Sequence, residues 1–190
     1  MHSAVIENQP AAAARQATTS TSAAGNGVDA GAFRAGMSRV GGACTIITAS
    51  HGDERAGLTA TAVCSVSAEP PRLLVCVNRN VRAHQLIGDS GWLGVNVLDA
   101  GHQDLAKRFA GMVQGVVGAD RFLAGDWRDS PHGVPVLRDA LVSFECRVVE
   151  ATVSGTHSIF LCEVTDVAAA DTASSALVYF NRSFVPIEAA

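Results

Sequence analysis

The alternation of hydrophobic and polar residues is clearest in the last third of the chain. From Val142 to Val148 the even-numbered residues are apolar and the odd-numbered residues between them are polar. Because successive side chains of a β-strand point to opposite faces, this alternation predicts a half-buried antiparallel strand over Leu141–Val149. Two further strands are predicted over Ser158–Val167 and Leu177–Phe180, with a turn at Val153–His157.

The first two thirds of the chain read as short elements separated by turn residues. Phe33, Met37 and Val40 recur at the spacing of one helix face, behind Asp29, a suitable N-cap. The adjacent prolines at 70–71 belong at a strand edge or corner, because proline cannot donate to a ladder. The other predicted strands lie over 43–50, 63–67, 73–77 and 92–98, and the other predicted helices lie over 82–87 and after Asp99. Turns are predicted at 51–53 and 89–91, and loops over 59–62 and 131–135. Residues 111–129 are predicted to be irregular, with a helical turn near 120–123.

The order of these elements bears on the fold class. Short strands outnumber helices, and they do not alternate with helices as they do in a parallel sheet. Neither G-x-G-x-x-G after a strand nor G-x-x-x-x-G-K is present, which disfavours a doubly wound nucleotide-binding fold. The pattern favours a mainly β protein, an antiparallel Greek-key barrel with a few peripheral helices.

Composition adds a domain boundary and excludes several classes of protein. The 190 residues, 48% of them hydrophobic, suit one domain of about 150–160 residues plus a tail. Residues 1–28 are rich in Ala, Thr and Ser and predict a disordered tail, so the folded domain is expected over residues 29–190. The net charge of −4 gives no reason to expect nucleic acid. No apolar run approaches the roughly 20 residues that span a bilayer, and the first residues lack the basic start of a signal peptide.

The five cysteines point to a reducing compartment. They are odd in number, are never spaced C-x-x-C, and each lies in an apolar or β-like segment. Buried free thiols in the cytoplasm are therefore expected, with no zinc or other metal site, because no histidine lies at ligand spacing from any of them.

The stretch Gly57–Asn80 carries the strongest sign of a ligand site. Its small residues let a flat molecule approach the backbone, and its hydroxyl and N–H groups suit a polar edge. The Asn78-Arg79-Asn80 cluster that ends the stretch suits a phosphate. The alternative is an ordinary strand, since Thr, Ser and Ala in alternation are also compatible with one.

Among residues able to carry chemistry, His157 stands out in a G-T-H turn before a strand. It is placed to offer a hydrogen bond or a positive charge to a ligand, or it is a loop histidine without a role. His84 suits a phosphate or a plain helix surface, and Arg108 suits a helix C-terminus or an anion. Phe109 is expected in the core, and the histidines at 51, 102 and 132 at the surface.

Other catalytic schemes find no support in the sequence. No G-x-S-x-G elbow of a hydrolase is present, and no acid-rich cluster suggests two-metal chemistry. The chemistry is therefore expected from a bound cofactor.

Six segments cover nearly all of residues 33–184 in order: F-R-A-G-M-S-R-V-G-G-A-C-T-I-I-T, G-L-T-A-T-A-V-C-S-V-S-A-E-P-P-R-L-L-V-C-V-N-R, S-G-W-L-G-V-N-V-L, L-A-K-R-F-A-G, G-T-H-S-I-F-L-C-E-V and L-V-Y-F-N-R-S-F. Together they resemble the flavin reductase-like family, the small NAD(P)H:flavin oxidoreductases that serve two-component monooxygenases. The resemblance implies a split β-barrel that binds FMN or FAD, a homodimer, and hydride transfer from NADH or NADPH. It places Thr61, Ala62, Val63, Cys64 and Ser65 along the isoalloxazine and ribityl chain, with Ser67 and Ala68 extending that contact, and Asn78, Arg79 and Asn80 at the flavin phosphate, flanked by His84, Arg108 and Phe109.

The resemblance also assigns the nicotinamide side of the site. His157 matches the histidine of the family's G-D-H motif and would orient the nicotinamide. Thr156 stands in place of the acidic residue, so a carboxylate that orients the ring is missing. Phe184 replaces a closing aromatic that is often Tyr in the family, and Arg182 completes the expected cofactor-binding set.

Four functions remain compatible with the sequence. The first is a flavin reductase that supplies reduced flavin to a separate monooxygenase in a bacterial cytoplasm. The second reduces another acceptor, such as a cobalt corrinoid or ferric chelate, through flavin. The third is a flavin- or haem-binding protein without turnover, and the fourth is a β-domain that acts only through its dimer surface. The sequence leaves FMN against FAD, and NADH against NADPH, undecided.

Overall fold

A computed structural model of the chain describes residues 27–171 and 175–188. The predicted tail therefore lies outside the described residues except at positions 27 and 28. The elements in chain order are α1 (Ala30–Met37), β1 (Gly42–Ala43), β2 (Thr45–His51), β3 (Glu54–Ala60), β4 (Val63–Ala68), β5 (Pro71–Asn78), α2 (Arg82–Ser90), β6 (Trp92–Val97), η1 (Ala100–His102), α3 (Gln103–Phe109), η2 (Gly118–Leu123), β7 (Trp127–Asp129), β8 (Pro135–Leu137), β9 (Val142–Ser154), β10 (His157–Ala169), β11 (Ser175–Phe180) and β12 (Ser183–Glu188).

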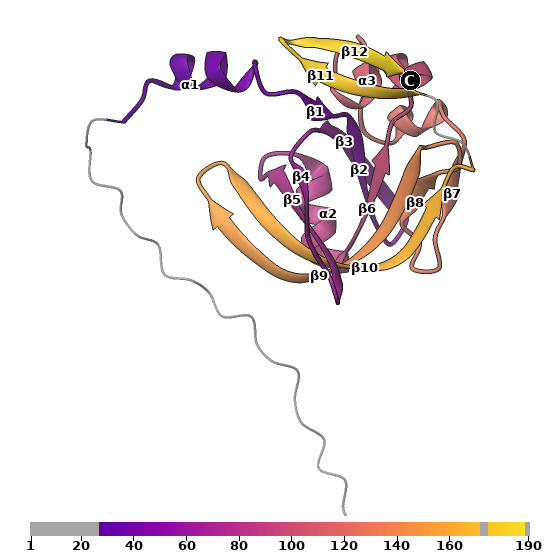
Figure 1. Cartoon of the computed structure of the whole chain (residues 1–190). Coiled ribbons are helices and arrows are strands. Elements are labelled where there is room, and N and C mark those ends of the chain that lie inside the picture. The colour runs from indigo at the N-terminus through magenta and orange to yellow at the C-terminus, as the bar shows by residue number, and fades with distance from the viewer. Residues whose placement is uncertain (1–26, 172–174, 189–190) are drawn as a thin grey trace, which may run out of the picture.

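Seven antiparallel strands form the body of the molecule, in the order β3-β2-β6-β9-β10-β5-β4 (Figure 1). The two end strands, β3 and β4, follow each other in the chain with only Thr61 and Ala62 between them. The sheet must therefore curve until its two edges approach, while no ladder joins β3 to β4 in the described part of the chain. This is a barrel with an open seam, and it confirms the predicted mainly β, split-barrel fold.

The core consists of two apolar clusters. The first fills the barrel, where the alternation of β5 buries Leu73, Val75 and Val77, and α2 covers one end with Leu86 and Ile87. The second cluster lies between α3, η2 and the small sheet β1-β11-β12, and includes Leu98, Phe109, Phe122 and Leu177. Together the two clusters fix the ends of β5, β10 and β11, from which the candidate site is built.

Helix α1 begins as predicted, because the Asp29 carboxylate accepts a hydrogen bond from the backbone N–H of Ala32 at 2.9 Å. Its apolar face is largely uncovered, since Phe33 and Met37 are 61% and 49% exposed; Val40, predicted on the same helix face, lies beyond the end of the helix and is 59% exposed. Figure 1 shows the helix on an arm that stands away from the barrel. The helix therefore offers an apolar surface that the described residues leave largely uncovered.

Several strands escaped the sequence pattern. The loop predicted over 59–62 is wrong at Thr59 and Ala60, which end β3. Strand β3 is poor in β-branched residues, and its pairing with β2 along the whole strand overrides that weak propensity. The short strands β7 and β8 pair within the predicted irregular stretch and loop, and β12 continues through Pro186. Proline is tolerated there because β12 pairs with β11 on one side only.

Element ends also differ from the prediction. Helix α2 continues through Asp89 and Ser90, which were predicted as a turn, and ends at Gly91 in the left-handed conformation with φ 74°. Strands β9 and β10 are 13 residues each, so the turn between them shrinks to Gly155 and Thr156. This tight turn places Thr156 and His157 opposite the end of β5.

The cysteines follow the prediction except at two positions. Cys44, Cys146 and Cys162 are buried free thiols, and burial raises the pKa of Cys44 to about 11 and that of Cys162 to about 12. Cys76 is only half-buried, and Cys64 on β4 is exposed, because its side chain faces away from the barrel core. None of the helices in the described residues is long and apolar enough to cross a membrane.

Candidate functional site

The end of β5 meets the β9–β10 turn. Asn78 is the register partner of His157, and the backbone N–H of Arg79 donates to the carbonyl of Thr156 at 2.9 Å. Within the next loop, the Asn78 side-chain oxygen accepts from the N–H of Asn80 at 2.9 Å. The predicted phosphate cluster and the predicted nicotinamide histidine are therefore neighbours, joined by backbone hydrogen bonds.

A cleft of about 710 Å³ opens beside this junction. We call it the α2 cleft, since one wall is formed by that helix. It contains one cation, Arg79, and one carboxylate, Asp89, among neutral donors and acceptors. Its lining residues are Arg79, Asn80, His84, Gln85, Gly88, Asp89, Gly155 and Thr156.

The ring of His84 is fixed in this cleft by two contacts. Its Nε2 atom lies 2.8 Å from the hydroxyl oxygen of Ser158, and its ring packs against Phe160 at 5.4 Å between centroids. Burial, and after it the positive charge of Arg79, lowers the pKa of His84 below its ordinary value. The ring is therefore biased toward the neutral form, with Nδ1 as the nitrogen that remains for a ligand.

His157 is exposed at the start of β10. Its Nδ1 atom lies 2.9 Å from the hydroxyl oxygen of Thr156. Because this contact occupies one ring nitrogen, Nε2 is the atom that remains for a ligand.

The β3–β4 connection opens on a second hollow, which we call the α1 groove, of about 390 Å³. Here Thr61 and Ala62 lie with Arg182 from the β11–β12 turn. Asn181 and Arg182 adopt φ of 48° and 62°, as required by a tight hairpin turn, and the N–H of Asn181 donates to the Ser38 carbonyl at 2.7 Å. This turn is thus fixed beside Thr61 and Ala62. These two belong to the cradle residues, our name for residues 61–65, 67 and 68, which were predicted along the isoalloxazine and ribityl chain.

A smaller slot of about 230 Å³, the Tyr179 slot, adjoins Thr61 on its other side. Tyr179 and Phe184 form an edge-to-face pair at 5.1 Å in its wall. Sequence reasoning found Phe184 but missed Tyr179. The alternation with buried Leu177 could have indicated it, since residues 177 and 179 share one face of β11. The other lining residues are Thr59, Ala60, Ala110 and Met112.

The remaining predicted cradle residues lie elsewhere. Val63, Ser65 and Ser67 line a groove of about 290 Å³ together with Arg72, near the beginning of β5 rather than its Asn78 end. Cys64 and Ala68 are exposed on the same strand. The structure therefore distributes the predicted cofactor residues along β4 and β5 and does not gather them in one closed cavity.

Two residues predicted beside the flavin phosphate, Arg108 and Phe109, contact other parts of the protein, and the burial of Phe109 agrees with its expected place in the core. Phe109 is 1% exposed in the second core cluster, so its ring is covered by protein. Arg108 donates from Nε to the carbonyl of Arg121 at 3.0 Å and from a terminal nitrogen to that of Asp120 at 2.7 Å. Both residues brace the wall behind the cradle, because η2 packs against them.

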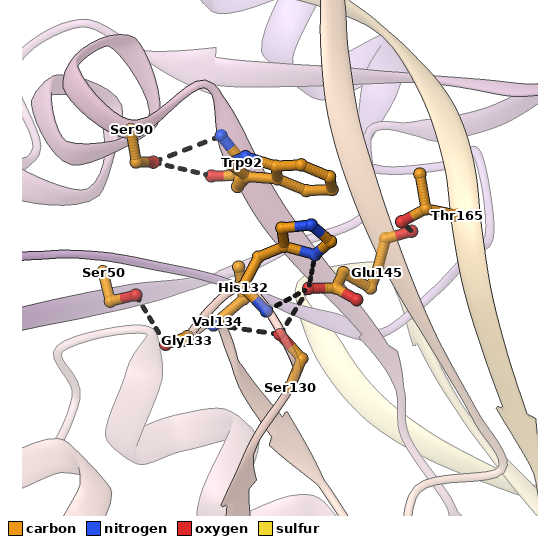
Figure 2. A network of polar contacts seen from close by, with 9 residues as sticks. All are labelled: Ser50, Ser90, Trp92, Ser130, His132, Gly133, Val134, Glu145 and Thr165. Atoms are coloured by element: carbon orange, nitrogen blue, oxygen red, sulfur yellow. Dashed lines mark hydrogen bonds and ion pairs between the residues drawn. The ribbon is translucent and has the colours of Figure 1, made fainter.

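His132 is exposed, as predicted, and also belongs to a polar network. His132 stacks on Trp92 at 3.6 Å between centroids, and its Nδ1 lies 3.0 Å from a carboxylate oxygen of the buried Glu145, which also accepts from the Ser130 hydroxyl (Figure 2). His51 is exposed, as predicted. The network around His132 holds the β7–β8 turn against β6 and β9.

His102 is the exception among the three histidines expected at the surface. Its side chain is only 15% exposed; Nε2 lies 3.2 Å from Asp139, and Nδ1 accepts from the N–H of Asp99 at 3.2 Å. These contacts hold the start of α3. Among residues 27–171 and 175–188, no three His, Cys, Asp or Glu side chains gather as metal ligands.

Comparison with known proteins identifies the family. The flavin reductase like domain matches residues 37–188. The chain is 46% identical over 157 residues to FMN reductase (NADH) RutF from Variovorax paradoxus. The match covers 83% of this chain and 85% of that protein. It is 42% identical over 153 residues to the 4-hydroxyphenylacetate 3-monooxygenase reductase component of Pseudomonas aeruginosa, with 80% and 89% covered.

A solved structure agrees with the sequence comparisons. BorF, the flavin reductase component of a bacterial two-component tryptophan halogenase, superposes with a TM-score of 0.76 at 31% identity, over 85% of this chain and 100% of that chain. The resemblance predicted from the sequence motifs is confirmed: the chain belongs to the flavin reductase-like family.

Proposed function

We propose that this oxidoreductase transfers hydride from NADH to FMN or FAD and supplies the reduced flavin to a separate monooxygenase. The observation that carries the proposal is the hydrogen bond between the Arg79 N–H and the Thr156 carbonyl. It joins a loop suited to a phosphate to a turn that carries an exposed histidine. A flavin nucleotide needs the first feature, and a nicotinamide ring that approaches it needs the second.

The residues present fit a flavin nucleotide. Arg79 and Asn80 provide a guanidinium and an amide for the phosphate in the α2 cleft, and His84 adds a ring nitrogen. The small residues Thr61 and Ala62 leave the backbone accessible at the barrel seam. When bound there, flavin would supply the ring system that accepts the hydride.

The protein's part in catalysis is to position the reactants. Residues that fix both rings at reacting distance replace a bimolecular encounter by an intramolecular one. His157 would contact the nicotinamide through Nε2 and need not transfer a proton. Tyr179 and Phe184 would close one side of the cradle and exclude water there.

Relatives support the finer choice of nucleotides and partner. The protein that shares 46% identity is named FMN reductase (NADH), which favours FMN and NADH for this chain. The 42% identical relative is named a reductase component of 4-hydroxyphenylacetate 3-monooxygenase, which favours a partner enzyme that uses the reduced flavin. The free thiols fit a reducing cytoplasm.

A homodimer completes the proposal. Leu74, Cys76, Ile159 and Leu161 are register partners on the outer face of β5 and β10, and all are half-exposed. Together with the uncovered face of α1, they form apolar surface suited to a second copy of the chain. Light scattering on the purified protein would give twice the chain mass if this is correct, and the chain mass if it is not.

NADH oxidation under air tests the function directly. The purified protein is mixed with NADH alone, then with FMN, then with FAD, and the loss of NADH absorbance is followed. We expect fast oxidation only after free flavin is added, with the preferred flavin giving the higher kcat/KM. A folded protein that oxidises neither NADH nor NADPH with either flavin would overturn the proposal.

A further inference from the structure

Thr156 is tied to both halves of the candidate site. Its carbonyl accepts a hydrogen bond from the Arg79 N–H at 2.9 Å, and its hydroxyl oxygen lies 2.9 Å from Nδ1 of His157. It also lines the α2 cleft with Arg79. A single residue therefore contacts the backbone of the loop proposed for phosphate and the ring proposed for nicotinamide.

We propose that the Thr156 hydroxyl is the positioning group for the His157 ring, and that it directs Nε2 toward the nicotinamide of NADH. The proposal rests on the proposed function, since it assigns the nicotinamide as the ligand of that ring. Thr156 thereby performs, through a neutral hydroxyl, the orientation that the missing carboxylate of the G-D-H motif would give.

The backbone around Thr156 is fixed well enough for this role. The turn consists of Gly155, with φ of 57°, and Thr156, and it is closed by the register pair Ser154 and His157. The hydrogen bond from Arg79 fixes the turn from the side of β5. With the backbone held from two strands, the hydroxyl is restricted mainly by the one side-chain torsion of a β-branched residue.

A hydroxyl differs chemically from a carboxylate in this position. An ionised carboxylate only accepts hydrogen bonds and favours the charged imidazolium, whereas a hydroxyl both donates and accepts. The Thr156 hydroxyl therefore holds His157 in either neutral tautomer and in the protonated form. The ring orientation does not depend on its charge, which suits a contact to an uncharged carboxamide.

Two substitutions separate the hydroxyl from the rest of the residue. Thr156→Val keeps the β-branched shape and the carbonyl that binds Arg79, but removes the hydroxyl. Thr156→Ser keeps the hydroxyl and removes a methyl group. If Thr156 serves only to form the turn, both variants behave alike, whereas a positioning role is lost in the valine variant and retained in the serine variant.

The first readout is the ring itself, without any nucleotide. In protein labelled selectively at histidine, NMR reports the ring-nitrogen shifts of His157, assigned by their absence in His157→Gln. We expect Thr156→Ser to keep the wild-type shifts and Thr156→Val to move them toward those of a free imidazole. Unchanged His157 shifts in Thr156→Val would overturn the hydrogen bond and with it the proposal.

The second readout is kinetic. Loss of one exposed hydrogen bond corresponds to about a threefold to tenfold weaker interaction, so Thr156→Val should raise the KM for NADH by that factor. The flavin dissociation constant should stay within about twofold of wild type, because Arg79 keeps its backbone contact. Thr156→Ser should restore the KM, and Thr152→Val, an exposed β-branched substitution on β9, serves as the matched control.

The two readouts distinguish failure of this inference from failure of the proposed function. A wild-type protein without NADH oxidation removes the function and the nicotinamide assignment together, whatever the ring shifts show. An active wild type whose KM for NADH is unchanged in Thr156→Val overturns the positioning role alone.

Discussion

The Nε2 atom of His84 lies 2.8 Å from the hydroxyl of Ser158, the residue that follows His157 on β10. Through this contact α2, which follows the loop proposed for phosphate, is bonded to the strand that carries the histidine proposed for nicotinamide. Among the described residues that line the α2 cleft, His84 is the titratable group that joins α2 to β10 through its side chain. The stability of the protein should therefore depend on pH through His84.

The direction of that sensitivity follows from the lowered pKa of His84, caused first by burial and then by Arg79. As pH falls through the ordinary value of 6.5, the unfolded chain takes up a proton that the folded chain resists. The stability that this group contributes above that pH is then lost until the folded pKa is reached. Urea unfolding between about pH 5 and pH 7.5 should show a smaller loss for His84→Gln than for wild type.

The comparison needs a histidine control, because His84 is not the sole histidine among the described residues. His51 is exposed, and His51→Gln should follow the wild-type pH dependence. Equal slopes of unfolding free energy against pH in wild type and His84→Gln would contradict the account of His84.

Arg79 should contribute to flavin affinity through the phosphate. A hydrogen bond to a charged group contributes more binding free energy than one between neutral groups. Its loss in Arg79→Ala should therefore raise the FMN dissociation constant by about tenfold or more. Riboflavin, which lacks the phosphate, should bind the variant and the wild type equally. The matched control is Arg82→Ala, since Arg82 pairs with Glu54. An unchanged FMN dissociation constant in Arg79→Ala would remove Arg79 from the phosphate site.

His157→Ala should impair NADH use more than flavin binding. Losing the ring removes a nicotinamide contact, so kcat/KM for NADH should fall by about tenfold while the flavin dissociation constant changes little. Stopped-flow reduction and flavin titration measure the two separately, with His51→Ala as the control. Equal losses in both quantities, or in neither, would refute the assigned role.

Gly57 should be required by packing rather than by chemistry. A Cβ atom there would lie 2.7 Å from Cε1 of Phe109 and 3.0 Å from the Ile47 carbonyl oxygen. Gly57→Ala should therefore lower the free energy of unfolding by about 1–3 kcal/mol. Gly88→Ala, on α2 with nothing within 4 Å of the new methyl, should be neutral or stabilising in the same denaturant titration. A fully stable Gly57→Ala would show that Phe109 moves aside freely.

Cys64 provides a reporter for the cradle strand. It is exposed on β4, whereas Cys44, Cys146 and Cys162 are buried. A thiol reagent should therefore show a fast phase that is absent in Cys64→Ser, and FMN should slow that phase if β4 lines the flavin. A fast phase that FMN leaves unchanged would place the flavin away from this strand.

Strand β9 could be predicted from the alternation of apolar and polar residues over Val142–Val148, but the burial of its polar face could not: Ser143 and Glu145 are buried because Asn96 and Ser130, on other segments, bond to them. Strand β3 could not, because its small residues are held in place by pairing with β2, a contact between strands that composition does not reveal. The same holds for β12, where Pro186 is tolerated at a sheet edge.

The candidate site, like the fold, could be predicted from the sequence only in part. Arg79 and His157 could be singled out from local motifs, because Arg79 follows the apolar run of β5 and His157 precedes the apolar run of β10. Their joining through Thr156 could not, since it depends on the register of β5 against β10. The exposure of His132 could be predicted, but its contacts could not, because its partners, Trp92 and Glu145, lie on two other strands of the sheet.

The most direct test of the central claim is anaerobic stopped-flow reduction of protein-bound flavin by NADH carrying deuterium at nicotinamide C4. The account predicts single-turnover bleaching of the flavin absorbance that is slowed severalfold by the deuterium at the transferred position. It also predicts a slower reaction in His157→Ala at the same NADH concentration. Flavin that stays oxidised in the presence of the folded protein and excess NADH would contradict the assignment of this site to hydride transfer.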